Sequence, residues 1–156
     1  MEQIFSTIQV NSSGQGLKDI TSFITNFIKE KKIITGLIVL NLMHTSCSLI
    51  VNENADPNVL KDLEKYINSI VPFNSYHDLT RDRTEIFYKH YQEGEDDMPA
   101  HIKTALTNTS LSFSIQNEKL MLGTWQGIYL WEHRFGSNIR KINIHAIGEI
   151  QKNIYN

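Results

Sequence analysis

The sequence predicts an α+β fold built as one domain over residues 1–156. Apolar residues recur at helical spacing in two or three segments of the first two-thirds, and the last third consists of short runs typical of strands. The length is sufficient for a real hydrophobic core. The order of these segments indicates helices followed by an antiparallel set of strands that completes a sheet or a sandwich.

The first half alternates predicted strands and helices. Alternating apolar and polar side chains indicate half-buried strands, whereas apolar residues three or four positions apart indicate helices. Asp56 is a natural N-cap and Pro57 suits the first helical position, so a helix is expected to begin there. The patterns predict a strand at 4–10, a helix at 17–32, a strand at 35–43 that 46–51 continues after a kink, and a helix at 57–71.

The second half begins with a stretch that has no clean period. Residues 73–92 mix aromatic, basic and acidic side chains, and we interpret them as a long loop with one helical turn, a kind of segment that is often functional. A helix is expected from about Pro99 to Leu106. The remaining chain predicts strands at 110–115, 120–122, 126–133 and 139–147, with a turn at 117–119.

Composition excludes several classes of protein. The 15 basic and 17 acidic residues form no basic stripe, so nucleic acid is not an expected partner. The longest apolar run, 33–43, is too short and too interrupted to span a membrane, and the first residues lack the pattern of a signal peptide. Cys47 is the only cysteine, which rules out an intrachain disulfide. We therefore expect a cytoplasmic protein with no membrane partner.

The run Glu93–Lys103 carries the strongest functional signal. It places four carboxylates, a glycine, a proline, a histidine and a lysine in eleven residues. Four like charges this close repel each other unless a cation, a helix N-terminus or a ligand stabilises them. Asp97 would lie at the positive end of the helix, with His101 and Lys103 close to the same point. A well-capped surface helix after an acidic loop is the alternative.

Two further places combine residues that can do chemistry. His44 ends a buried strand, and Glu53 lies in a polar cluster that helix capping does not fully explain. Trp125 lies between two glycines, which suggests a close approach of the backbone to another group. Along the next strand, either Gln126 with Glu132 or Trp125 with His133 can point into a pocket, but not all four. Backbone-bonded histidines and a solvated strand end are the alternatives.

Three histidines near element ends suggest a metal centre. His44, His101 and His133 would supply imidazole ligands, and catalytic zinc sites use three protein ligands with an open position. Spacing gives no support, because no two of these histidines form a local ligand pair. A buried thiol is the simplest reading of Cys47.

Several motifs together resemble the YjbQ-like family, also called the secondary thiamine-phosphate synthase family. They are His44–Leu49, Asn52–Pro57, Asp96–Lys103 and Gly123–Tyr129, and the resemblance extends from the first strand to Glu149. It implies a small β-sandwich of mainly antiparallel strands flanked by helices, assembled as a homotrimer. It also implies weak condensation of a hydroxymethylpyrimidine diphosphate with a thiazole phosphate, which releases pyrophosphate. The site positions that match the family are His44, Glu53, Asp97, His101, Gln126 and Glu132.

Three functions stay open at this point. In a condensing enzyme, acids such as Asp96 and Asp97 would hold magnesium, and basic groups would contact the phosphates. In a hydrolase, a histidine-bound metal would activate water with a glutamate or aspartate as base. A trimer that binds a metabolite without turnover is the third. The residues expected to act are His44, His101, Asp97, Glu53 and Glu132 in catalysis, Gln126, Lys103, Trp125, Arg134 and Arg140 toward a small-molecule substrate, and His44, His101 and His133 toward zinc or magnesium.

Overall fold

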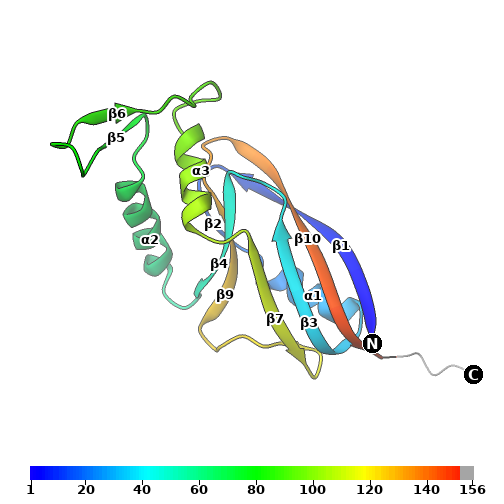
Figure 1. The fold of residues 1–156 in the computed structure, drawn as a ribbon. Coiled ribbons are helices and arrows are strands. Elements are labelled where there is room, and N and C mark those ends of the chain that lie inside the picture. Colours follow the sequence, from blue (N-terminus) through cyan, green and yellow to red (C-terminus); the bar gives the residue numbers. More distant parts are fainter. Residues whose placement is uncertain (152–156) are drawn as a thin grey trace, which may run out of the picture.

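A computed structural model describes residues 1–151 of the chain (Figure 1). Three helices and ten strands follow one another along it. The helices are α1 (Thr21–Glu30), α2 (Pro57–Ile70) and α3 (Asp97–Leu106). The strands are β1 (Glu2–Ser13), β2 (Gly16–Asp19), β3 (Ile33–Leu42), β4 (Cys47–Glu53), β5 (Ser75–His77), β6 (Glu85–Phe87), β7 (Ser110–Gln116), β8 (Lys119–Leu120), β9 (Gln126–Glu132) and β10 (Ser137–Ile150).

Eight of the ten strands form two antiparallel sheets that share one core. The larger sheet has the order β1-β10-β3-β7-β8, and the smaller one has the order β2-β9-β4. In Figure 1 the strands curl around one another, with α1 against them and α2 and α3 on the side of β4 and β9. The main core joins Ile142 and Leu40 of the larger sheet, Leu130 of the smaller sheet and Ile24 of α1. The α+β prediction is therefore confirmed.

Strand β9 is buried on both faces, which explains its apolar sequence. Ile128 and Leu130 face the main core, whereas Tyr129 and Trp131 pack in a second cluster with Ile67 of α2. Alternate side chains of a strand point to opposite faces, so one strand can serve both clusters. The helix therefore covers the face of β9 that the main core does not use.

The start of α2 confirms the capping pattern. Asp56 accepts a hydrogen bond from the backbone N–H of Asn58 through Oδ1 at 2.8 Å, and Pro57 is the first helical residue. The backbone N–H of Val71 donates to the carbonyl of Ile67 where the helix ends. Both ends of this helix are as the sequence predicts.

The structure corrects two predicted elements in the first half of the chain. Leu17 belongs to strand β2 and pairs with Trp131, and the first helix begins only at Thr21, whose N–H donates to Oδ1 of Asp19. Residues 47–53 do not continue β3 but form β4 in the other sheet. In these cases the local apolar pattern was read correctly as buried, while the partner that buries it lies far along the chain.

The segment 73–92 holds a β-hairpin rather than a helical turn. Strands β5 and β6 pair antiparallel through Ser75–Phe87 and His77–Glu85, and in Figure 1 the hairpin projects beyond α2 and α3. Asp82 and Arg83 in the connecting loop adopt positive φ. Strands of three residues are too short to show a period, which is why the sequence did not reveal them. Among residues 1–151, no helix is long and apolar enough to cross a membrane.

Candidate functional site

The acidic run before α3 is neutralised by an arginine from the end of β9. Arg134 contacts Asp96 through Nε at 3.0 Å and Asp97 through Nη1 at 2.8 Å. It also contacts the Glu93 carboxylate at 3.3 Å and donates to the Glu93 carbonyl. Burial alone would lower the pKa of Arg134, but Asp96, Asp97 and Glu93 raise it overall. Of the cation, helix N-terminus or ligand that the sequence allowed as a stabilising partner, the structure has a cation, the side chain of Arg134.

Arg134 satisfies only one of the two oxygens of Asp97. Asp97 is 1% exposed, and its Oδ1 accepts a hydrogen bond from Arg134. Its Oδ2 is the one buried side-chain polar atom in residues 1–151 that has no hydrogen-bond partner. Buried polar atoms are almost always satisfied, so an orphan carboxylate oxygen is a strong pointer to a missing cation or donor.

Two histidines lie against Asp97. Nε2 of His90 is 3.0 Å from Oδ2 of Asp97, although the two atoms are not aligned for a hydrogen bond. His101 lies one helical turn after Asp97 on α3, and its Nε2 is 3.4 Å from Oδ1 of Asp97. One ligand atom from each residue can be chosen so that all three lie within 4.8 Å of one another. We call His90, Asp97 and His101 the metal-ligand cluster.

A hydrogen bond to the backbone shows which ring nitrogen of His101 carries a hydrogen. Nδ1 lies 2.8 Å from the backbone carbonyl of Thr45, just before β4. A carbonyl can only accept, so Nδ1 carries a hydrogen, and in the neutral imidazole Nε2 is then the nitrogen that can bind a metal. Histidines that ligate metals commonly donate their other N–H to a carbonyl in this way.

The donor set fits a divalent transition metal. Two imidazole nitrogens and a carboxylate oxygen are the ligands of many catalytic zinc sites, which keep a further position open. The buried, unpartnered Oδ2 of Asp97 and the fixed tautomer of His101 are the observations that support the fit. Magnesium fits less well because it prefers oxygen ligands.

The sequence reasoning identified two members of this cluster and missed the third. His90 lies in the segment 73–92, which showed no period. For Asp97 and His101 the sequence holds a signal, because residues four apart lie on one face of a helix. His90 lies outside the helix and has no such spacing. His90 precedes Asp97 by only one short loop.

The other two predicted metal histidines lie outside the cluster of their own chain. Nε2 of His44 accepts from the backbone N–H of Lys141 at 2.8 Å, and burial, with Arg140, lowers its pKa. His133 is buried with its Nε2 2.9 Å from Oγ of Ser48. Burial, followed by the charge of Lys103, lowers the pKa of His133 to about 3. Burial and nearby positive charge therefore favour the neutral form of both imidazoles.

Glu132 and Arg140 form a buried ion pair in which two guanidinium nitrogens donate to the two carboxylate oxygens. Arg140 donates to Oε2 of Glu132 at 2.7 Å through Nε and to Oε1 through Nη2. Ser12 and the backbone N–H groups of His133 and Arg134 also donate to the carboxylate. Burial raises the pKa of Glu132, but these donors lower it overall. The carboxylate is fully partnered in the structure.

Lys103 and Cys47 are likewise enclosed. Nζ of Lys103, a side chain 1% exposed, donates to Oδ1 of Asn68 and lies 4.9 Å from the ring centre of Phe73. Burial lowers the pKa of Lys103 despite nearby Glu64 and Asp96. Burial also raises the pKa of the Cys47 thiol to about 12, which makes it a packing residue rather than a nucleophile.

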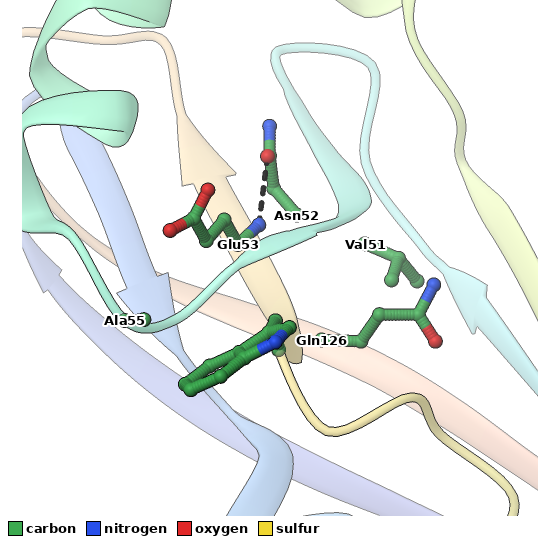
Figure 2. Close-up of a pocket in the computed structure, with 6 residues that line it drawn as sticks. Val51, Asn52, Glu53, Ala55 and Gln126 are labelled. Carbon is green, nitrogen blue, oxygen red and sulfur yellow. Dashed lines mark hydrogen bonds between the residues drawn. The ribbon is translucent and has the colours of Figure 1, made fainter.

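Three predicted site residues meet at a separate hollow of about 550 Å³ (Figure 2). Glu53, Trp125 and Gln126 line it where β4 ends and β9 begins. In Figure 2 the side chains of Glu53 and Gln126 extend away from each other. Oε1 of Gln126 accepts from the N–H of Gly123 at 2.7 Å, so the glycine makes room for this side chain.

The hollow and the metal-ligand cluster lie at opposite ends of β4. Thr45, which holds His101, precedes Cys47 at the start of the strand, whereas Glu53 is its last residue. Six residue steps at about 3.3 Å each separate the two ends by roughly 20 Å. Within one protomer, Glu53, Trp125 and Gln126 therefore lie apart from Asp97 and His101.

Known proteins resemble this chain over nearly its whole length. The family model described as UPF0047 protein YjbQ-like matches residues 6–149. The UPF0047 protein sll1880 of Synechocystis is 41% identical over 141 residues, which cover 90% of this chain and 89% of that protein. The UPF0047 protein YjbQ of Salmonella typhimurium is 40% identical over 144 residues, covering 92% and 96%.

Solved structures show the same fold. An uncharacterised conserved protein of the YjbQ/UPF0047 family from Clostridium acetobutylicum superposes with a TM-score of 0.73 at 30% identity, covering 92% of this chain and 99% of that one. A protein of unknown function from Sulfolobus solfataricus, described as YbjQ-like, gives a TM-score of 0.75 at 20% identity. It covers 95% of this chain and 100% of its own, and this likeness concerns the fold alone.

Proposed function

The chain belongs to the UPF0047 family of YjbQ-like proteins, and we propose that it is a metal-dependent enzyme that hydrolyses a small molecule. The observation that carries the proposal is the buried Oδ2 of Asp97, which has no hydrogen-bond donor and faces the imidazole of His90. With His101 it offers three ligand atoms to one divalent ion. The cytoplasmic location stays a prediction.

The protein's own groups would prepare this site. A zinc ion bound there would supply Lewis-acid activation of water or of a substrate oxygen. The carbonyl of Thr45 accepts from Nδ1 of His101 and leaves Nε2 for a metal, and Arg134 binds Oδ1 of Asp97 and leaves Oδ2. Such neighbours orient ligands and tune their basicity.

Hydrolysis also needs a group that accepts a proton. Glu132 is buried and accepts from Arg140 with both oxygens, and Asp97 would be a ligand. Glu93 contacts the same Nη1 atom of Arg134 as Asp97 does, and its side chain is 75% exposed. We therefore assign Glu93 the role of base within one protomer. Glu53 lies too far along β4 to serve unless another protomer supplies it.

We further propose the homotrimer that the family resemblance implies. A trimer would place the hollow of Glu53, Trp125 and Gln126 from one protomer beside the metal-ligand cluster of the next, which would join the two groups. A mass of about three times the 18.0 kDa chain in analytical ultracentrifugation is the expected result. A monomer at micromolar concentration would contradict it.

The condensation that the resemblance implies stays a prediction that the geometry favours less. The acids expected to hold magnesium, Asp96 and Asp97, are paired with Arg134. Of the basic groups expected at the pyrophosphate, Arg140 is paired with Glu132 and Lys103 is buried on Asn68. These pairings leave few free charges for a pyrophosphate leaving group.

Metal titration tests the proposal directly. Purified protein should bind one zinc per chain in calorimetry, and His90→Ala, Asp97→Asn and His101→Ala should each weaken binding by about 100-fold. His145→Ala is the matched control, because His145 stacks on Phe5 on β1 and lies outside the cluster. Equal zinc affinity in wild type and His101→Ala would overturn the proposal.

Turnover then separates an enzyme from a binding protein. The zinc-loaded wild type should hydrolyse at least one member of a panel of small esters, amides and phosphate monoesters, and Asp97→Asn should not. A protein that binds zinc but turns over nothing, with bound metabolites unchanged after incubation, would support the non-catalytic alternative instead.

A further inference from the structure

An apolar pocket of about 570 Å³ borders the metal-ligand cluster. It lies between the end of α2, the β5–β6 hairpin with the residues that follow it, and α3. Volumes of this size are typical of sites that bind small molecules.

His90 belongs to both the pocket and the cluster. Its side chain lines the pocket, while its Nε2 lies 3.0 Å from Asp97 and its ring centre 5.3 Å from that of His101. Met98 and Ile102 of α3 also line the pocket, and each follows a cluster residue by one position. A molecule in this pocket would therefore reach the metal ligands with one end.

The walls suit an aromatic group. Ile70, Phe87 and Tyr76 line the pocket, yet these large side chains are 40–66% exposed. The rings of Tyr76 and Tyr88 lie 5.6 Å apart in a tilted arrangement, which leaves ring faces and edges for a further aromatic partner. A ligand here would remove apolar surface from water at several side chains at once.

The charges of the lining favour an anion. Lys89 is the one lysine or arginine in its lining, and no aspartate or glutamate lines it. Asp97 lies behind His90, but it is paired with Arg134. One ammonium matches a singly charged carboxylate, and an ion at the cluster would add further positive charge at the same end. Apolar walls with a cationic end thus define the chemistry of the ligand.

We propose that this pocket binds a small aromatic carboxylate, with the ring between the β5–β6 hairpin and α3 and the carboxylate toward His90. The inference rests on the proposed function for the part that a metal plays at that end. The substrate class is then an aromatic ester or amide, in which water cleaves the acyl bond to release this carboxylate and an alcohol or amine.

Calorimetry with 2-naphthoate tests the pocket. Phe87→Ala should weaken binding by about fivefold through lost apolar contact, and Lys89→Gln by a similar factor through lost charge. Leu79→Ala is the matched control: it lies on the same hairpin loop, is 87% exposed and does not line the pocket. The cation 2-naphthylmethylammonium should bind about tenfold more weakly than 2-naphthoate.

Coupling to zinc tests the orientation. Saturating zinc should raise the affinity for 2-naphthoate by about fivefold, 2-naphthoate should raise the zinc affinity by the same factor, and Asp97→Asn should remove both effects. Zinc binding without any 2-naphthoate binding, or with binding that Phe87→Ala leaves unchanged, would overturn the inference while the proposed function stands. A pocket already covered by a second copy of the chain would give that result.

Failure of the proposed function would be visible separately. If zinc does not bind while 2-naphthoate still binds with dependence on Phe87 and Lys89, the proposed function fails and the pocket assignment is supported on its own. If neither binds, both are overturned.

Discussion

Arg134 and Asp97 are joined by a single contact, 2.8 Å between Nη1 and Oδ1, that leaves the second carboxylate oxygen facing His90. The pairing neutralises part of the charge of Asp97 and holds its plane. It also leaves Oδ2 buried and without a donor, which is costly unless a cation comes to it. This half-paired carboxylate is what distinguishes the cluster from an ordinary surface ion pair.

Zinc should therefore stabilise the folded protein. A ligand that binds only the native state at 100 times its Kd adds about 2.7 kcal/mol, which would raise the Tm of a domain of this size by about 5–10 °C. Asp97→Asn should abolish the increase, whereas His145→Ala should keep it. Thermal unfolding followed by circular dichroism at fixed protein concentration measures both, and an equal increase in Asp97→Asn would contradict the prediction.

The pair of Glu132 and Arg140 should matter for stability rather than for turnover. Arg140→Ala leaves a buried carboxylate without its main partner, and such changes typically cost about 3–5 kcal/mol of unfolding free energy. Lys141→Ala is the control, because its side chain is exposed on the neighbouring position of β10. Urea denaturation compares the variants, and similar midpoints for Arg140→Ala and wild type would show that the pair is dispensable.

Acid should destabilise the protein partly through His133. Its pKa of about 3 in the folded state lies below the usual histidine value of 6.5, so the unfolded chain binds more protons between these values. Stability from neutral His133 is thus present above pH 6.5 and is lost as pH falls toward 3. From pH 7 to pH 5 this loss amounts to about 2 kcal/mol at most. His44, whose pKa is also lowered, acts in the same direction.

His133→Gln provides the measurement for that prediction. Glutamine keeps a polar group near Ser48 but does not titrate, so the drop in unfolding free energy between pH 7 and pH 5 should become smaller than in wild type. Urea denaturation at the two pH values gives the difference. An unchanged drop would mean that His133 is not the residue that senses pH in this range.

Variants of Glu93 and Glu53 can decide which residue is the general base of the proposed hydrolysis. Glu93→Gln should lower kcat by about 100-fold or more with zinc affinity nearly unchanged, as loss of a general base does. If Glu53→Gln has that effect instead, the base comes from a neighbouring protomer. Mixing Glu53→Gln chains with Asp97→Asn chains would then restore part of the activity, which neither variant has alone.

Local patterns in the sequence predicted much of the scaffold. The alternation in 4–10, the apolar run in 35–43 and the N-cap at Asp56 reflect interactions within a few residues, and the structure has elements at all three places. Residues 17–20 misled because Leu17 and Ile20 share a helical spacing with α1, although Leu17 pairs with Trp131 more than a hundred residues away. Periodicity tells which side of a segment is buried, not what buries it.

For the candidate site too, part could be predicted from local sequence and part depended on the tertiary structure. The sequence alone determined that the acids of 93–97 stand at a helix start with His101 on the next turn, and that they need a positive partner, because like charges repel at short range. Only the tertiary structure decided that Arg134 is that partner, that His90 completes the cluster, and that Glu53 and Gln126 lie at the far end of β4. Those outcomes depend on strand pairing and chain reversal across long separations, and local spacing carries no record of them.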